Sequence, residues 1–501
     1  MTADALLGLV MLIVMIGVIF IGFPISFTLL FLALTFGFFS FGETVFNLAY
    51  YQTIGMMKEE LLAAVPLFIF MGFLTEQAGL MERLFIAFRN ILAPIRGSLY
   101  AVVILTAAVF AMATGIVGAA VTVLGIMASP IMVRTGYDGK LSAGAITAGG
   151  TLGILIPPSV MLIVMGPVLG VSVADLYASA FGPGFLLAGL YLVYLLGRAF
   201  VNPKLGPPVP KEERVHSFAV MVKELLIGVV PLLALIVAAL GSILAGLATP
   251  TEASGIGALG ALILAAVYRR LTFGALKRAV LNTTATTSMV LLLAVTSNIF
   301  GAVFARLGTA NWITDTMLSL PLPPVAMLVV VLFLIFVLGW PFEWPAIVLV
   351  FLPIFYPVVD ALRPGLGQAL GISPEMVMVW FGALVAVTLQ TAFLSPPVAM
   401  SAYYLKQVVK DWSLATIYKG MFEFMLLQCI AIALVVGVPA IATWFPERLQ
   451  AQSRAIKTEA VEGGATLEDY ESGYGQELDK AIEKESQPGD PLEQDELPKN
   501  K

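Results

Sequence analysis

Two Pro-Pro pairs are the residues whose type and setting first suggest chemistry in this sequence. Pro157 and Pro158 lie in GGTLGILIPPSVMLIV and precede Ser159, whereas Pro396 and Pro397 lie in TLQTAFLSPPVAMSAYY. Proline lacks a backbone N–H and displaces the carbonyl four residues earlier, so each pair leaves polar backbone groups free within an apolar stretch. Free carbonyls can coordinate Na⁺, and freed helix N-termini can face an anion. The pairs therefore predict a binding site, with simple kinks in packed helices as the alternative.

Glu343 is the second chemical candidate, because it stands between apolar runs in GWPFEWP. A carboxylate inside a membrane is costly, and its presence marks a functional position by default. It could serve as a coupling carboxylate in transport. The alternative is a carboxylate at a helix end that is paired with a base or open to water.

The elements that position these residues must lie in a membrane. Of the 501 residues, 59% are hydrophobic and 12% are charged, and the mean hydropathy is +0.96. Soluble proteins are about 45–50% apolar and about 25% charged, so a soluble globular fold is excluded. Charge-free stretches such as 5–42, 97–133 and 376–405 exceed the length of a spanning helix. We expect roughly 11–14 membrane-embedded elements.

Charge and rare residue types exclude several classes of function. The formal net charge is −5, but the acidity belongs to the C-terminal tail and no basic face for nucleic acid is present. With one cysteine and one histidine, neither a disulfide framework nor an H-E-x-x-H metalloprotease site can form. No G-x-x-x-x-G-K-[ST] motif for ATP occurs. An intramembrane enzyme and an ATP-driven pump are therefore disfavoured.

The chain reads as two related membrane halves. A proline-rich, mixed-charge linker at 201–224 separates a first repeat, 1–200, from a second, 225–446. The residues from 447 to 501 are rich in Glu, Gln, Gly and Ser, and this composition predicts an acidic, disordered tail.

Landmark residues recur in the same order in both halves. Pro24 matches Pro250, Gly115 matches Gly339, and one Pro-Pro pair follows in each half. Duplicated halves with Gly/Pro-interrupted segments at corresponding places are the sequence sign of a secondary transporter.

With these segments in place, the chain resembles the large membrane subunit of tripartite ATP-independent periplasmic (TRAP) transporters, the DctM-like family of the ion transporter superfamily. The similarity runs over nearly all of residues 1–446. It includes the segments GFPISFTLL, PLFIFMGFLTEQAGLMERL, GYDGKLSAGAITAGGTLGILIPPSVMLIV, ATPTEASGIGALGALI and LSPPVAM. The resemblance implies an all-α polytopic membrane protein with an inverted-repeat, ion-transporter-type elevator fold, re-entrant hairpins and broken helices.

The resemblance also implies a function. It indicates a secondary transporter of the bacterial inner membrane, not an enzyme, that imports a small organic acid: a 2-oxo acid, another monocarboxylate or a C4-dicarboxylate. Na⁺ would be the coupling ion, with no other cofactor. A small four-helix membrane subunit and a periplasmic substrate-binding protein would be the partners, within the lipid bilayer and without nucleic acid. The alternative is a stand-alone ion-coupled organic-anion transporter or a channel that needs no binding protein.

Family ion and substrate sites lie around broken helices and hairpin tips. The matching positions here are Thr114, Gly115, Gly118, Gly153, Ile156, Pro157, Pro158, Ser159, Ser297, Asn298, Gly339, Gln390, Thr391, Ser395, Pro396 and Pro397. The chain departs from the family pattern where Ser-Gly-Ser-Ser is common, because Ala113 to Ile116 reads ATGI. With fewer hydroxyl ligands, Na⁺ coordination would depend more on Thr114 and on backbone carbonyls. Glu343 stands where the family often carries an aspartate.

Overall fold

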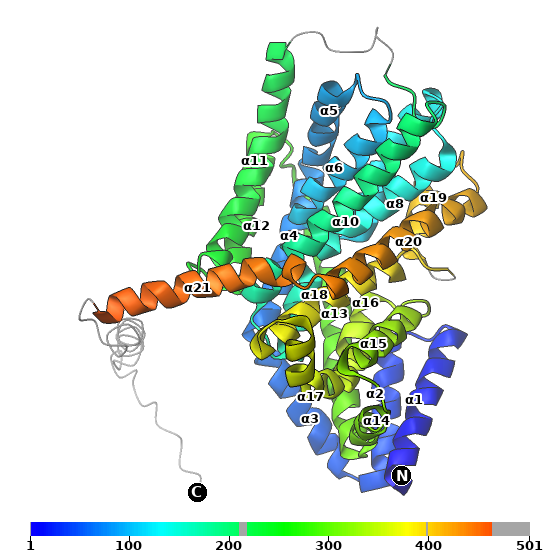
Figure 1. The fold of residues 1–501 in the computed structure, drawn as a ribbon, viewed down its shortest axis with the longest axis vertical. Coiled ribbons are helices and arrows are strands. Elements are labelled where there is room, and N and C mark those ends of the chain that lie inside the picture. Colours follow the sequence, from blue (N-terminus) through cyan, green and yellow to red (C-terminus); the bar gives the residue numbers. More distant parts are fainter. Residues whose placement is uncertain (1, 210–217, 397–398, 463–501) are drawn as a thin grey trace, which may run out of the picture. The chain divides into compact units, whose positions relative to one another are not determined.

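The computed structural model describes residues 2–209, 218–396 and 399–462, with the side chains at 111, 113, 114, 218, 453 and 455–462 left aside. Every regular element in these ranges is a helix (Figure 1). The first half holds α1 (Ala3–Ile21), α2 (Ile25–Phe41), α3 (Thr44–Met57), η1 (Glu60–Ala63), α4 (Ala64–Gln77), α5 (Leu80–Leu92), α6 (Ser98–Thr114), α7 (Val117–Arg134), α8 (Gly139–Leu155), α9 (Val160–Leu169) and α10 (Val173–Val201).

The regular elements described in the second half are also helices. It holds α11 (Phe218–Leu244), α12 (Pro250–Val267), α13 (Phe273–Arg306), α14 (Thr309–Leu318), α15 (Pro324–Leu338), α16 (Trp344–Ala346), the π-helical turn η3 (Ile347–Phe351), α17 (Leu352–Leu370), α18 (Pro374–Ala392), α19 (Met400–Val408), α20 (Leu414–Gly437) and α21 (Ala440–Glu462). The landmark residues matched in the sequence lie between α6 and α7 (Gly115) and after α15 (Gly339), and the two Pro-Pro pairs lie between α8 and α9 and between α18 and α19.

The membrane helices confirm the all-α polytopic fold that the family resemblance implies. Among the described residues, ten helices are long and apolar enough to cross a membrane, or up to eleven if the bent pair α8–α9 is one span. Shorter apolar helices lie at Ile25–Phe41, Ser98–Phe110 and Pro324–Leu338.

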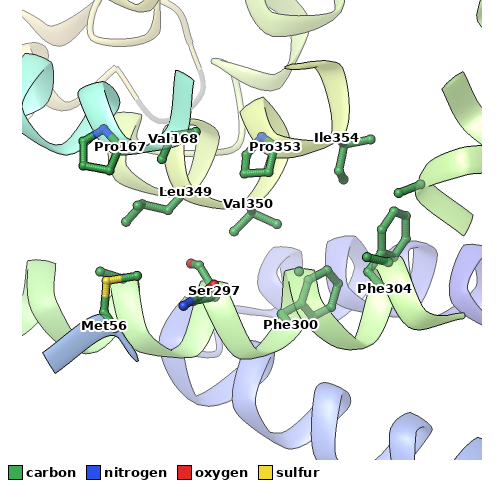
Figure 2. Close-up of a pocket in the computed structure, with 15 residues that line it drawn as sticks. Met56, Pro167, Val168, Ser297, Phe300, Phe304, Leu349, Val350, Pro353 and Ile354 are labelled. Atoms are coloured by element: carbon green, nitrogen blue, oxygen red, sulfur yellow. The ribbon is translucent and has the colours of Figure 1, made fainter. Parts of the chain in front are cut away.

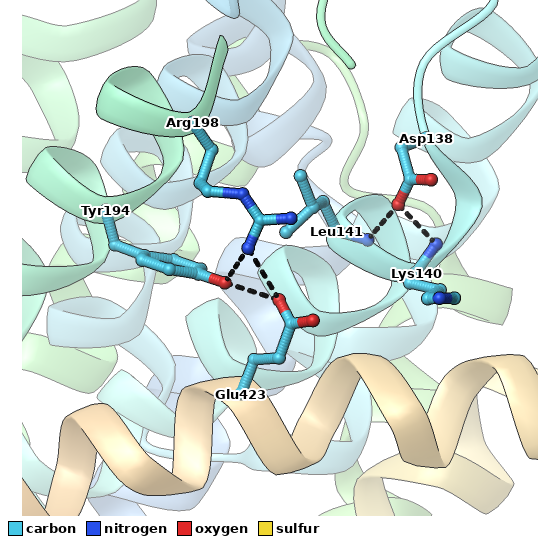
Figure 3. A network of polar contacts seen from close by, with 6 residues as sticks. All are labelled: Asp138, Lys140, Leu141, Tyr194, Arg198 and Glu423. Atoms are coloured by element: carbon cyan, nitrogen blue, oxygen red, sulfur yellow. Dashed lines mark hydrogen bonds and ion pairs between the residues drawn. The ribbon is translucent and has the colours of Figure 1, made fainter. Parts of the chain in front are cut away.

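Local sequence fixes where these helices begin. Asp138 precedes α8, and its carboxylate accepts hydrogen bonds from the backbone N–H groups of Lys140 at 3.0 Å and Leu141 at 2.9 Å (Figure 3). Thr249 and Glu252 form a reciprocal capping box before α12, in which Pro250 occupies the first turn. Such caps satisfy N–H groups that have no partner within the helix.

The two broken helices form the centre of the first compact unit, which spans residues 1–446; residues 447–501 form a second unit. Every residue of α8 from Leu141 to Leu155 is buried, and so is every residue of α18 from Met376 to Ala392. The predicted tail begins within α21, and its residues from 463 onward lie outside the described ranges.

The start of the predicted linker is held against the first half. The Leu205 carbonyl accepts from the Tyr100 hydroxyl at 2.6 Å and from the Asp138 N–H at 3.0 Å. The neighbouring Gly206 carbonyl accepts from the Gly97 N–H at 2.9 Å. These bonds fix residues 205–206 beside the starts of α6 and α8.

A polar cluster connects α10 with α20, the last membrane helix of each half (Figure 3). The Tyr194 hydroxyl donates to the Glu423 carboxylate, and Arg198 Nη1 lies 2.7 Å from the Tyr194 hydroxyl and 3.6 Å from the Glu423 carboxylate. The Arg198 side chain is 44% exposed and that of Glu423 is 32% exposed.

We expect Glu423→Gln to lower the free energy of unfolding by less than about 1 kcal/mol, because exposed ion pairs contribute little. Thermal unfolding of the purified protein measures this. Transport should be unchanged, and a large loss of stability would show that the cluster is a main attachment between the halves.

Candidate functional site

The first break brings a glycine against carbonyls released by proline. Gly115 joins α6 to α7 with φ of +59°, a left-handed conformation that favours glycine. A Cβ built on Gly115 would lie 3.7 Å from the Pro158 carbonyl oxygen and 3.8 Å from that of Gly153. Gly153 is four residues before Pro157, so its carbonyl is the one that loses its helical donor there. Helices α8 and α9 meet at this point at a bend of 47°.

Ser159 completes the first break. Its hydroxyl donates to the Ile154 carbonyl, which is the carbonyl left free by Pro158. The hydroxyl proton is therefore used internally, and the oxygen presents its lone pairs to the surroundings. Oxygen atoms with no competing donor are the ligands that hard cations prefer. The chemistry of this donor set suits Na⁺.

At the second break a glycine also lies close to a residue that precedes the Pro-Pro pair. A Cβ on Gly339 would lie 3.0 Å from the Ala392 Cβ and 3.3 Å from its Cα, and Ala392 is four residues before Pro396. This contact differs from that of Gly115, because Gly339 meets the Ala392 Cβ and Cα and not its carbonyl, and its φ of −63° is right-handed helical. The match between Gly115 and Gly339 therefore stays a prediction from the sequence.

Buried oxygens surround the second break. The Thr391 hydroxyl donates to the Thr388 carbonyl at 2.6 Å, and the Ser395 hydroxyl to the Thr391 carbonyl at 2.7 Å. Gln390 is fully buried, and its Oε1 has no hydrogen-bond partner among the described residues. Leaving a buried acceptor unpaired costs about 1–3 kcal/mol, which a bound cation would offset. Pro396 is exposed, and Pro397 lies outside the described residues.

One cavity of about 200 Å³ lies where both halves meet. It takes backbone and side chains from the first break, from the second, and from α4 and α13. The lining residues are Ile69, Gly115, Ile116, Val117, Gly118, Ile154, Val160, Thr286, Met289, Val290, Glu343, Trp344, Pro345, Phe393, Met400 and Tyr404. Glu343 is the charged member of this lining, and Thr286 and Tyr404 add hydroxyls.

The Tyr404 side chain forms the part of the cavity wall that contacts α7 of the first half. A Cβ on Gly118 would lie 3.0 Å from the Tyr404 Cζ, so the ring packs directly on the α7 backbone. Tyr404 ends the Pro-Pro segment TLQTAFLSPPVAMSAYY, but neither it nor Thr286 is among the site residues predicted from the sequence. The one signal for Tyr404 is its place just after the second Pro-Pro pair, on α19.

The structure separates some predicted site residues from the breaks. Ser297 and Asn298 line another cavity, of about 340 Å³, farther along α13 (Figure 2). Ile156 is buried and packs on Gly184 of α10, where a Cβ would lie 2.7 Å from the Ile156 Cγ1. The Thr114 side chain lies outside the described residues.

Residues from a helix break in each half line one shared cavity, an arrangement typical of a secondary transporter rather than an enzyme. More particularly, the chain belongs to the DctM component family of tripartite ATP-independent periplasmic transporters, whose family model matches residues 12–441. It is therefore a large permease subunit of a tripartite system and a multi-pass protein of the inner membrane.

Two relatives agree with this assignment. The chain is 29% identical over 433 residues to the sialic acid TRAP transporter large permease protein SiaM of Vibrio cholerae, covering 86% of this chain and 96% of that protein. It is 28% identical over 450 residues to the C4-dicarboxylate TRAP transporter large permease protein DctM of Rhodobacter capsulatus, covering 87% and 98%.

The fold is similar to that of the Alcanivorax borkumensis YdaH transporter, with a TM-score of 0.55 and 17% identity, covering 81% of this chain and 90% of that one. It is also similar to that of Neisseria gonorrhoeae MtrF, with a TM-score of 0.53 and 14% identity, covering 79% and 84%.

Proposed function

We propose that this chain imports a small organic acid by Na⁺-coupled secondary transport with an elevator mechanism. The observation that carries the proposal is the left-handed Gly115 beside the Gly153 carbonyl that Pro157 leaves free, at a cavity that also takes residues from the second break. Carbonyl and hydroxyl oxygens at these positions would hold Na⁺, and the bound positive charge would attract the carboxylate of the substrate. The partners would be a small four-helix membrane subunit and a periplasmic binding protein.

The cavity lining favours an acid with one carboxylate. Relatives are named for sialic acid and for C4-dicarboxylates. In this chain the described lining of the break cavity contains no lysine or arginine, and its charged member is Glu343. A second carboxylate would have no cationic side chain to pair with in this lining, only the hydroxyls of Thr286 and Tyr404, and an unpaired charge there is unfavourable. A 2-oxo acid or another monocarboxylate fits this lining better than a C4-dicarboxylate.

Reconstitution in proteoliposomes tests the proposal. The complete system, with both partners, would be given labelled pyruvate, succinate or N-acetylneuraminate under an inward Na⁺ gradient. We expect uptake of pyruvate that needs both the gradient and the binding protein. Uptake that persists without the gradient and without the binding protein would instead support the stand-alone transporter or channel.

Gln390→Met tests the Na⁺ site at the second break. The substitution keeps the side-chain length and removes the unpaired oxygen, so the Na⁺ concentration for half-maximal uptake should rise about tenfold, equivalent to about 1.4 kcal/mol. Gln428→Met is the matched control, because Gln428 is also fully buried with an unpaired Oε1 but lies between α10 and α20. Equal shifts in both variants would refute a specific ion role for Gln390.

A further inference from the structure

One face of α13 lines both cavities described above. Thr286, Met289 and Val290 belong to the lining of the break cavity. Ala294, Ser297, Asn298, Gly301, Phe304 and Ala305 belong to the lining of the larger cavity. Positions that recur every three or four residues share one face of a helix. From Thr286 to Ala305 this face is about 28 Å long at 1.5 Å per residue, close to the hydrocarbon thickness of about 30 Å.

The wall opposite α13 also runs continuously from one cavity to the other. In the break cavity it includes Val160 at the start of α9 and Trp344 at the start of α16. In the larger cavity it includes Val168 near the end of α9, together with Val350 and Pro353 of η3 and α17 (Figure 2). Because the same elements face α13 in the same order, the two cavities are successive spaces along one seam.

The larger cavity contains an unsatisfied polar group. Ser297 is 1% exposed, and its hydroxyl has no hydrogen-bond partner among the described residues. The adjacent Asn298 amide reaches the Gln52 carbonyl at 3.5 Å, the long limit of a hydrogen bond. Apolar residues such as Phe300 and Phe304 form the rest of this α13 wall. A hydroxyl and an amide in apolar surroundings can each donate to a passing carboxylate.

The direction of the seam follows from charge. The segment before and at the start of α13 carries Arg269, Arg270, Lys277 and Arg278, and basic segments favour the cytoplasmic side. The C-terminal end of α13, and with it the larger cavity, then lies toward the periplasm. Arg306 at that end stacks over the Phe41 ring at 4.8 Å, away from the seam.

We infer that the larger cavity is the outer vestibule of the substrate path, in which Ser297 and Asn298 bind a carboxylate before it reaches the break cavity. The inference rests on the proposed function, because it assumes that an organic acid crosses along this seam. It gives Ser297 and Asn298 a role in binding the substrate as it enters, separate from the Na⁺ ligands at the breaks.

Cysteine accessibility tests the vestibule in intact cells that carry the complete system. In a Cys429→Ser background, Ser297→Cys would be treated with the anionic, membrane-impermeant reagent sulfonatoethyl methanethiosulfonate. Leu292→Cys is the control, because Leu292 is exposed on α13 and lines neither cavity. A thiol must meet water and ionise to react. We expect Ser297→Cys to react about tenfold faster than Leu292→Cys, and its modification to stop pyruvate uptake.

Two results would overturn the inference. If Ser297→Cys is labelled as slowly as Leu292→Cys, water does not reach the larger cavity. If Ser297→Cys is labelled fast but uptake is unchanged, the substrate does not pass through that cavity. If the cysteine-free protein takes up none of the three test acids, the proposed function fails. Because labelling needs no substrate, its rate would still decide whether the cavity is open to water.

Binding in the vestibule has a kinetic signature of its own. We expect Ser297→Ala to raise the KM for pyruvate while the Na⁺ concentration for half-maximal uptake stays unchanged. A shift in Na⁺ dependence like that of Gln390→Met would place Ser297 in the ion site instead and contradict the vestibule.

Discussion

Gly115→Ala is expected to abolish Na⁺-dependent uptake while the protein still folds and inserts. At φ of +59°, any side chain costs about 1–2 kcal/mol of backbone strain. The methyl group would also stand in front of the Gly153 and Pro158 carbonyl oxygens, 3.8 and 3.7 Å away. These are the oxygens that we assign to Na⁺, so the ion would lose its access to them. Uptake in proteoliposomes and thermal unfolding measure the two effects separately.

Gly371→Ala is the matched control for Gly115→Ala. Gly371 has φ of +69° at the end of α17, and nothing lies within 4 Å of a Cβ built on it. The two variants should therefore lose a similar amount of folding free energy, because in each an alanine must adopt the left-handed backbone conformation. Gly371→Ala should keep most of its uptake. If both variants transported equally well, the carbonyls near Gly115 would not be ion ligands.

Gly118→Val is expected to reduce uptake by about tenfold or more, corresponding to about 1.4 kcal/mol or more. The Tyr404 ring occupies the space that the new side chain needs, with its Cζ 3.0 Å from the Cβ position. Overpacking of this kind costs about 1–3 kcal/mol. It would also push α19 away from α7, at the place where the second half closes the cavity on the first. Uptake rate and substrate affinity should both fall.

Two further variants separate the effect of the contact between Gly118 and Tyr404 from a general loss of folding. Gly189→Val places the same residue in α10, where nothing lies within 4 Å of the Cβ position, and it should transport normally. The double variant Gly118→Val with Tyr404→Ala removes the clash, so it should recover part of the uptake that the single variant loses. Double-mutant cycles isolate such pairwise coupling. Losses that simply add would show that Gly118 and Tyr404 act independently.

The sequence alone predicted the parts of the site that depend on covalent chemistry. Proline removes a donor wherever it occurs, so the Pro157–Pro158 pair marked a broken helix, which the structure bends at that point. A glycine at position 115 similarly allowed the left-handed turn. The apolar composition required helices that span a membrane, and the family pattern followed from the same segments. These features need no knowledge of which helices pack together.

Tertiary packing decided which of these features meet. No local pattern could place Gly115 against Gly153, or the Tyr404 ring on Gly118, because those contacts join elements that are far apart in the sequence. For the same reason the sequence alone assigns Ser297 and Asn298 to the same site as the breaks, although they line a separate cavity. Backbone chemistry is local, and the sequence states it directly. A cavity is the space left between distant helices, and only their packing determines its lining.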